Sequence, residues 1–142
     1  MEVPEVEPSM RQLVVELART VLTGQVVPIR RLLIGEVHRF PELAEEYYRR
    51  GPQTVMDTLA RALRRLDARG QLDVPDAEAA AEHLAFLVLG PTMDRALFRI
   101  ADRPPDRAAQ VEARAHVAFD AFLAIYRPGG AAHGGTAARS RH

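Results

Sequence analysis

Residues 77–89, AEAAAEHLAFLVL, carry the strongest structural signal in the chain. Ten of these thirteen residues are apolar, and only Glu78, Glu82 and His83 interrupt them. A helix that is apolar on nearly all sides has to be covered on more than one side. The stretch therefore predicts a helix that packs against several neighbours, with Asp76 as its N-cap.

Apolar residues recur at helical spacing on both sides of this stretch, and no segment alternates with the period of two that a strand requires. Capping residues, glycines and prolines mark the predicted helix ends. They predict helices from Ser9 to about Thr23, from Pro28 to Phe40, over 42–49, and from Pro52 to Arg69 with Gly70 in the left-handed conformation. A further helix is predicted over 77–89, after which Gly90-Pro91 bends or restarts the chain and a segment to about Ile100 follows, and the last helix runs from Pro104-Pro105 to about Tyr126. We expect an all-α bundle of about six to seven helices, one domain over 9–127, between disordered segments over 1–8 and 128–142.

The last predicted helix carries an apolar stripe whose members are four and three residues apart, a spacing typical of helices in four-helix bundles. Two interpretations are open. The stripe can belong to a single intramolecular core, or the last two long helices can pair with those of a second copy as a four-helix dimer bundle. We adopt the dimer. The predicted interface residues are Phe86, Met93, Leu97, Val111, Ala115, Ala118, Phe119 and Phe122.

Composition excludes several classes of protein. The 142 residues contain no cysteine, which excludes disulfides, thiolate zinc sites and cysteine nucleophiles. All nineteen basic residues are arginine, so Schiff-base catalysis by lysine is excluded, and they balance nineteen acidic residues. A net charge near zero argues against a surface that coats nucleic acid.

The N-terminal sequence gives no targeting signal. Glu2, Glu5 and Glu7 have the wrong charge for a signal peptide. The longest apolar run, over 84–89, has six residues, whereas a membrane-spanning helix needs about 20. We expect a cytoplasmic protein that does not contact the membrane.

A candidate metal site is formed by Glu112, His116 and Asp120, which share one helix face at i, i+4 and i+8. One helix offers only two or three ligands, and a complete site needs others from elsewhere. The alternative, which we favour, is a solvated face or the edge of an interface. We predict no metal, no cofactor and no catalytic residues, and therefore no enzyme.

Two further side chains have two interpretations each. His83 lies among apolar residues, where it can form a hydrogen bond at an interface or line a pocket. Glu36 can place a carboxylate near a cavity or form an ion pair with Arg39 or Arg31. The residues alone leave both questions open.

Residues 31–43, RLLIGEVHRFPEL, resemble the ligand domain of TetR-type transcriptional regulators. In that family an arginine-leucine helix ends in a glutamate, and a turn of aromatic-Pro-Glu-Leu follows. The resemblance continues through Gly51-Pro52, through ARGQL at 68–72, and into DAEAAAEHL at 76–84, where the family has an acidic cap before an alanine-rich helix. It covers about residues 10–126 and is nearest to the AefR-like or AcrR-like C-terminal domains.

The resemblance implies an effector-binding and dimerisation domain that senses a small apolar or amphipathic molecule. It places the last two long helices in a four-helix dimer bundle and the ligand pocket among residues 28–39, 52–69 and 76–89. The candidate lining residues are Leu33, Glu36, Val37, Met56, Leu59, Leu63, Leu84 and Val88. Each of them can instead be an ordinary core residue.

One departure from the family pattern concerns DNA. Family members begin with a helix-turn-helix domain that reads the operator, whereas this sequence begins at the helix that follows such a domain. We therefore expect contact with DNA only through a domain that this chain lacks. The alternative function is that of a stand-alone helical homodimer, a protein-interaction module that binds neither ligand nor DNA.

Overall fold

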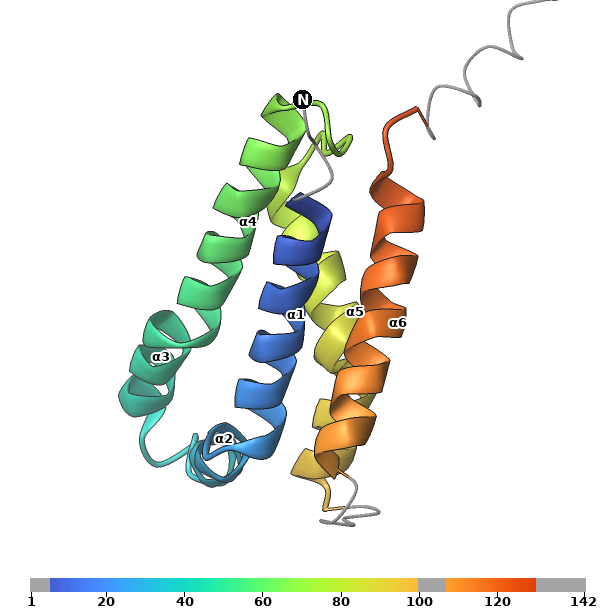
Figure 1. Ribbon diagram of the computed structural model, residues 1–142. Coiled ribbons are helices and arrows are strands. Elements are labelled where there is room, and N and C mark those ends of the chain that lie inside the picture. Colours follow the sequence, from blue (N-terminus) through green and yellow to red (C-terminus); the bar gives the residue numbers. More distant parts are fainter. Residues whose placement is uncertain (1–5, 100–106, 130–142) are drawn as a thin grey trace, which may run out of the picture.

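The computed structural model describes residues 6–99 and 107–129, and within these residues it contains six helices and no strand (Figure 1). This confirms the predicted all-α class. Residues 1–5 and 130–142 of the predicted disordered segments lie outside the described residues. The helices are α1 (Val6–Thr23), α2 (Val26–Gly35), α3 (Pro41–Arg50), α4 (Pro52–Ala68), α5 (Ala77–Leu97) and α6 (Arg107–Tyr126).

Several helix ends follow from local residues, as predicted. Asp76 precedes α5, and its carboxylate accepts a hydrogen bond from the Ala79 backbone N–H at 3.1 Å. Gly70 follows α4 with a φ of 77°, a left-handed conformation that glycine adopts without a Cβ clash. Pro41 and Pro52 open α3 and α4, where a missing N–H costs no helical hydrogen bond.

Three of the predicted helices have ends that differ from the structure. Helix α2 runs over Val26–Gly35 and ends before the predicted Phe40, because residues 36–39 form a turn. Helix α1 begins at Val6, before Ser9, because Pro8 is tolerated in a first turn whose N–H groups have no partner inside the helix. Helix α5 continues through Pro91 to Leu97 and does not restart there. Pro91 removes the donor to the carbonyl of Leu87, and Leu87 lies on the exposed side of α5, where water can replace that donor.

Helix α5 is the centre of the bundle, as its apolar composition suggests. It contacts α1, α2, α4 and α6, and Figure 1 shows α1 and α6 beside it. The largest fully buried side chains come from four helices: Phe119, Phe122, Leu63, Leu84 and Val14. One contiguous core therefore joins α1, α4, α5 and α6.

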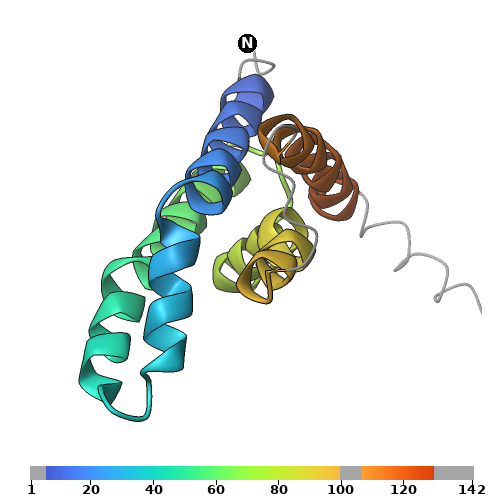
Figure 2. The ribbon, with the colours of Figure 1, turned by 90° about the horizontal axis from the view of Figure 1, so that it is seen from below.

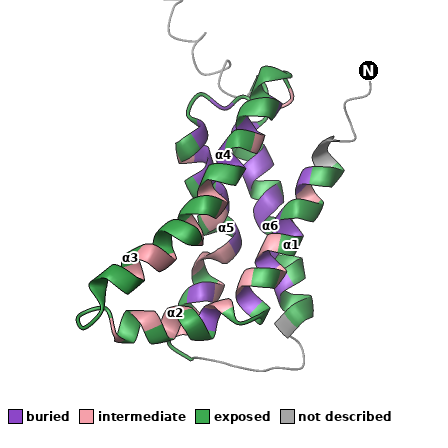
Figure 3. Cartoon of the chain, turned by 90° about the vertical axis from the view of Figure 1, so that its left-hand side faces the viewer, coloured by how far each residue is buried: buried purple, intermediate pink, exposed green. Residues whose placement is uncertain are grey.

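Helices α2 and α3 lie at the edge of this core. No residue of α3 is buried, and Val27 is the buried residue of α2. Figure 3 shows both helices mainly in the colours of exposed and half-buried residues, and Figure 2 shows them extending away from α5 and α6. This end of the molecule has apolar side chains that the core does not cover.

His83 and Tyr126 join α5 to the end of α6. His83 Nδ1 lies 2.6 Å from the Tyr126 hydroxyl, and the Asp73 backbone N–H donates to the Tyr126 carbonyl at 2.8 Å. His83 thus corresponds to the hydrogen-bonded interpretation. Burial of the ring, and secondly the negative charge of Asp76, raise the pKa of the Tyr126 hydroxyl.

We expect Tyr126→Phe to remove a pH dependence of stability at alkaline pH. Because the folded state favours the neutral phenol, its contribution is complete below the unfolded-state pKa of about 10 and is lost as the pH rises through the raised pKa. At neutral pH the variant should lose about 1 kcal/mol with the hydrogen bond to His83. Urea unfolding followed by circular dichroism, at neutral and at alkaline pH, measures the free energy of unfolding of the wild type and the variant. If both proteins lose the same free energy between the two pH values, the prediction is contradicted.

Candidate functional site

An open groove lies where α2, α3, the first residue of α4 and the end of α5 meet. Its volume is about 350 Å³, near the lower end of the range for small-molecule sites, about 300–1,000 Å³. The lining residues are Arg30, Leu33, Ile34, Val37, Ala44, Tyr47, Tyr48, Pro52 and Leu97. The groove is therefore built mainly from the two helices that the core leaves uncovered.

The lining is apolar apart from three side chains. The guanidinium of Arg30 and the hydroxyls of Tyr47 and Tyr48 are the polar groups, and no carboxylate lines the groove. Ile34 remains 56% exposed and Tyr48 54% exposed. A molecule with an apolar body would remove this surface from water, which favours binding at about 25 cal/mol per Å² of apolar area.

Arg31 holds one wall of the groove against α5. Its guanidinium donates to the carbonyl oxygens of Ala96 and Leu97, the last residues of α5, the second at 3.3 Å. A cation at the C-terminal end of a helix also complements the helix dipole. The position of α2 is thus tied to the end of α5.

The opposite wall is held by the corner between α3 and α4. The Gly51 backbone N–H donates to the Tyr47 carbonyl at 2.9 Å, and the Thr54 hydroxyl donates to the Arg49 carbonyl at 3.1 Å. These bonds satisfy carbonyl groups at the end of α3, which would otherwise lack a partner. They place the two tyrosine side chains at the groove.

The structure separates the predicted pocket residues into two groups. Leu33 and Val37 line the groove, and Glu36 lies beside them but forms an ion pair with Arg39 at 3.2 Å. Met56 is half-buried and packs against the core. Leu59, Leu63, Leu84 and Val88 are core residues with at most 3% exposure. These four do not line the groove, because α4 packs directly on α5.

Sequence reasoning missed most of the groove. Helix α3 carries Ala44, Tyr47 and Tyr48 at i, i+3 and i+4, which place them on one face. Because the rest of this short helix is strongly charged, that spacing could have identified an apolar face of α3 in the sequence. No sequence pattern indicated that Arg30 and Leu97 line the same groove, because only the packing of α2 against α5 brings them together.

The predicted interface residues also separate into two groups. Six are buried within the single chain, with at most 6% exposure: Met93, Val111, Ala115, Ala118, Phe119 and Phe122. Met93 lies on α5, and α1 and α5 cover the face of α6 that carries the other five side chains. Leu97 lines the groove, and Phe86 is 74% exposed.

A second apolar stripe lies on the exposed side of α6. Val117 is 69% exposed and Ile125 is 59% exposed, and Ala121 and Ala124 between them are exposed as well. Residues 117, 121 and 124 follow the spacing i, i+4 and i+7, so they share one helix face. Phe86 projects from the neighbouring helix α5, and Figure 2 shows α5 and α6 side by side, away from α3.

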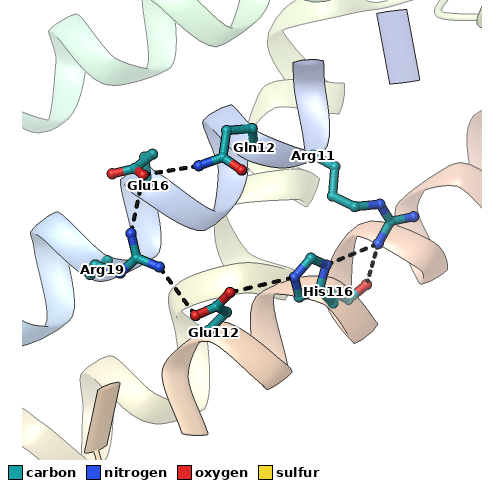
Figure 4. A network of polar contacts seen from close by, with 6 residues as sticks. All are labelled: Arg11, Gln12, Glu16, Arg19, Glu112 and His116. Atoms are coloured by element: carbon teal, nitrogen blue, oxygen red, sulfur yellow. Dashed lines mark hydrogen bonds and ion pairs between the residues drawn. The ribbon is translucent and has the colours of Figure 1, made fainter. Parts of the chain in front are cut away.

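The candidate metal ligands are engaged with α1. Asp120 binds Arg11 at 2.6 Å, Glu112 binds Arg19 at 3.1 Å, and Arg11 also lies 3.3 Å from His116 Nδ1. Figure 4 shows the contacts of Glu112 and His116 across the two helices. Among the described residues no group of three side chains is arranged to hold a metal ion. Glu112, His116 and Asp120 therefore lie at the edge of an interface, which is the one between α1 and α6.

Comparisons with known proteins relate this architecture to a family. The chain matches the AefR-like transcriptional repressor C-terminal domain over residues 8–128. It is similar to the crystal structure of a protein from Mesorhizobium loti assigned to the TetR-family transcriptional regulators, with a TM-score of 0.78 and 29% identity. The match covers 85% of this chain and 59% of that protein. Among curated proteins none matches the chain. In the described part of the chain no helix is both long and apolar enough to cross a membrane.

Proposed function

Since the chain belongs to the family of AefR-like transcriptional repressor C-terminal domains, matched over residues 8–128, we propose that it is the effector-binding and dimerisation domain of a TetR-type transcriptional regulator. A small apolar or amphipathic molecule binds in the groove between α2 and α3 and controls DNA binding by the head domain of the regulator. The observation that carries the proposal is the open apolar groove, whose residues all fall within the matched range.

The groove is connected to the helix that would lead to the head domain. Helix α2 forms one wall and follows α1 after Gly24 and Gln25, and the two helices contact each other. A ligand that shifts α2 therefore acts on α1 as well. The effect requires that the ligand bind one arrangement more tightly, and about 1–3 kcal/mol of such preference is typical.

Dimerisation is supported by the exposed stripe on α6 together with Phe86 of α5. Exposed apolar side chains that gather on one helix face mark interaction sites on a protein. A two-fold axis beside α5 and α6 would place the same patch of both copies in contact. The last two long helices then form a four-helix bundle with their mates, through a face of α6 different from the predicted one.

Native mass spectrometry of the purified chain tests both parts of the proposal. We expect a dimer that retains a small molecule as extra mass. The variant Ile34→Glu should remain a dimer and lose the extra mass, because the added carboxylate places a negative charge in the apolar groove. A monomer would contradict the dimerisation domain, and a retained molecule that survives this substitution would contradict the groove as its site.

A further inference from the structure

We propose that the groove selects amphipathic anions: an apolar chain or ring lies on α2 and α3, and a carboxylate binds the guanidinium of Arg30. This inference rests on the proposed ligand-binding function and names the ligand class. Its occupant is a small carboxylate with a medium-length apolar body.

The charge of the groove is not neutralised by the protein. Arg30 is the charged residue of the lining, it is half-buried, and it has no hydrogen bond or ion pair among the described residues. A cation that loses part of its water shell without gaining a partner is unfavourable. An incoming carboxylate supplies that partner, and the guanidinium matches its two oxygens.

The neighbouring arginines differ from Arg30 in this respect. Arg39 pairs with Glu36 at 3.2 Å, and Arg49 and Arg50 both pair with Glu46, at 3.3 Å and 2.7 Å. Carboxylates of the chain thus pair with these three arginines on α3 and the turn before it. Arg30, by contrast, lines the groove and has no carboxylate partner among the described residues, so it is available to an external anion there.

Two hydroxyl groups add to the preference for an acceptor. Tyr47 and Tyr48 line the groove, and neither hydroxyl has a hydrogen-bond partner in the part of the chain that the structure describes. A phenol donates one hydrogen bond, and a carboxylate only accepts. The polar groups of the groove are therefore all able to donate to the same kind of ligand.

The remaining surface sets the size and character of the ligand body. Leu33, Ile34, Val37, Pro52 and Leu97 offer it aliphatic surface. The volume of about 350 Å³ holds roughly a dozen groups of the size of a water molecule, at about 30 Å³ each. A medium-chain carboxylate such as octanoate has this size.

The test is isothermal titration calorimetry of the whole chain with octanoate, octanol and octylammonium. We expect octanoate to bind most tightly and octylammonium most weakly, because Arg30 attracts one charge and repels the other. Arg30→Gln should weaken octanoate binding about tenfold, the effect of one lost hydrogen bond to a charged group, and leave octanol binding unchanged. Arg30→Lys should recover part of the loss.

The control variant is Arg65→Gln, which removes the same charge from the exposed side of α4, away from the groove. It should leave all three affinities unchanged, and circular dichroism should show that each variant is folded. Equal binding of octanoate and octanol, unaffected by Arg30→Gln, would overturn the anion preference and leave the proposed ligand binding intact. If none of the three binds, although native mass spectrometry shows a retained molecule, the ligand class is wrong. If none binds and no molecule is retained, the proposed function fails as well.

Discussion

Replacing Phe122 with alanine is expected to lower the free energy of unfolding by about 3–5 kcal/mol. The side chain is fully buried in α6, and its ring centroid lies 4.7 Å from that of Tyr126 and 6.3 Å from that of Phe119. Truncation removes the transfer free energy of the ring and leaves a cavity that rigid helices fill only in part. The loss is large against a typical total of about 5–15 kcal/mol.

Urea unfolding followed by circular dichroism measures this loss, with Phe98→Ala as the matched control. Phe98 is 75% exposed, so the same truncation there should change stability by less than about 0.5 kcal/mol. The loss in Phe122→Ala should be the same at every protein concentration, because the ring packs within one chain. A loss below about 1 kcal/mol, or one that appears only in dilute protein, would instead place Phe122 between two copies.

The second large effect is expected from Val117→Arg, which should convert the proposed dimer to a monomer. A two-fold axis brings the new cation into the interface twice, once from each copy. A buried charge without a partner costs several kcal/mol, so the dissociation constant should rise by at least about a hundredfold. The fold should remain intact, because Val117 is 69% exposed within the chain.

Analytical ultracentrifugation over a range of concentrations measures the dissociation constant. Leu43→Arg is the matched control: Leu43 is an apolar residue of α3 with 55% exposure, far from the stripe on α6. It should leave the dimer unchanged. If Val117→Arg dimerises as strongly as the control, the contact between copies lies on another face.

Features that depend on neighbours along the chain could be predicted from the sequence. Asp76 caps α5, Gly70 ends α4, and Pro52 opens α4, because capping and proline chemistry act within about one helical turn. The all-α class follows from apolar periodicity in the same way. Leu33 and Val37 were found at the groove through the family resemblance, and not from local spacing.

The local sequence pattern could not predict which of the two apolar faces of α6 packs into the core. Both faces carry apolar residues at helical spacing, and the stripe with the larger side chains, Phe119 and Phe122, is the one that α1 and α5 cover. Packing selects the face that buries more apolar area. The smaller stripe around Val117 is left for solvent or a second copy.

Sequence alone thus established which segments are helices, where most of them end, and that α5 needs neighbours on several sides. The tertiary structure decided which side chains face inward and where the groove lies. The reason is the range of the interactions concerned. Caps and periodicity join residues a few positions apart, whereas Arg31 binds α5 across 65 positions and Arg11 binds Asp120 across 109. Contacts of that range exist only once the helices have packed.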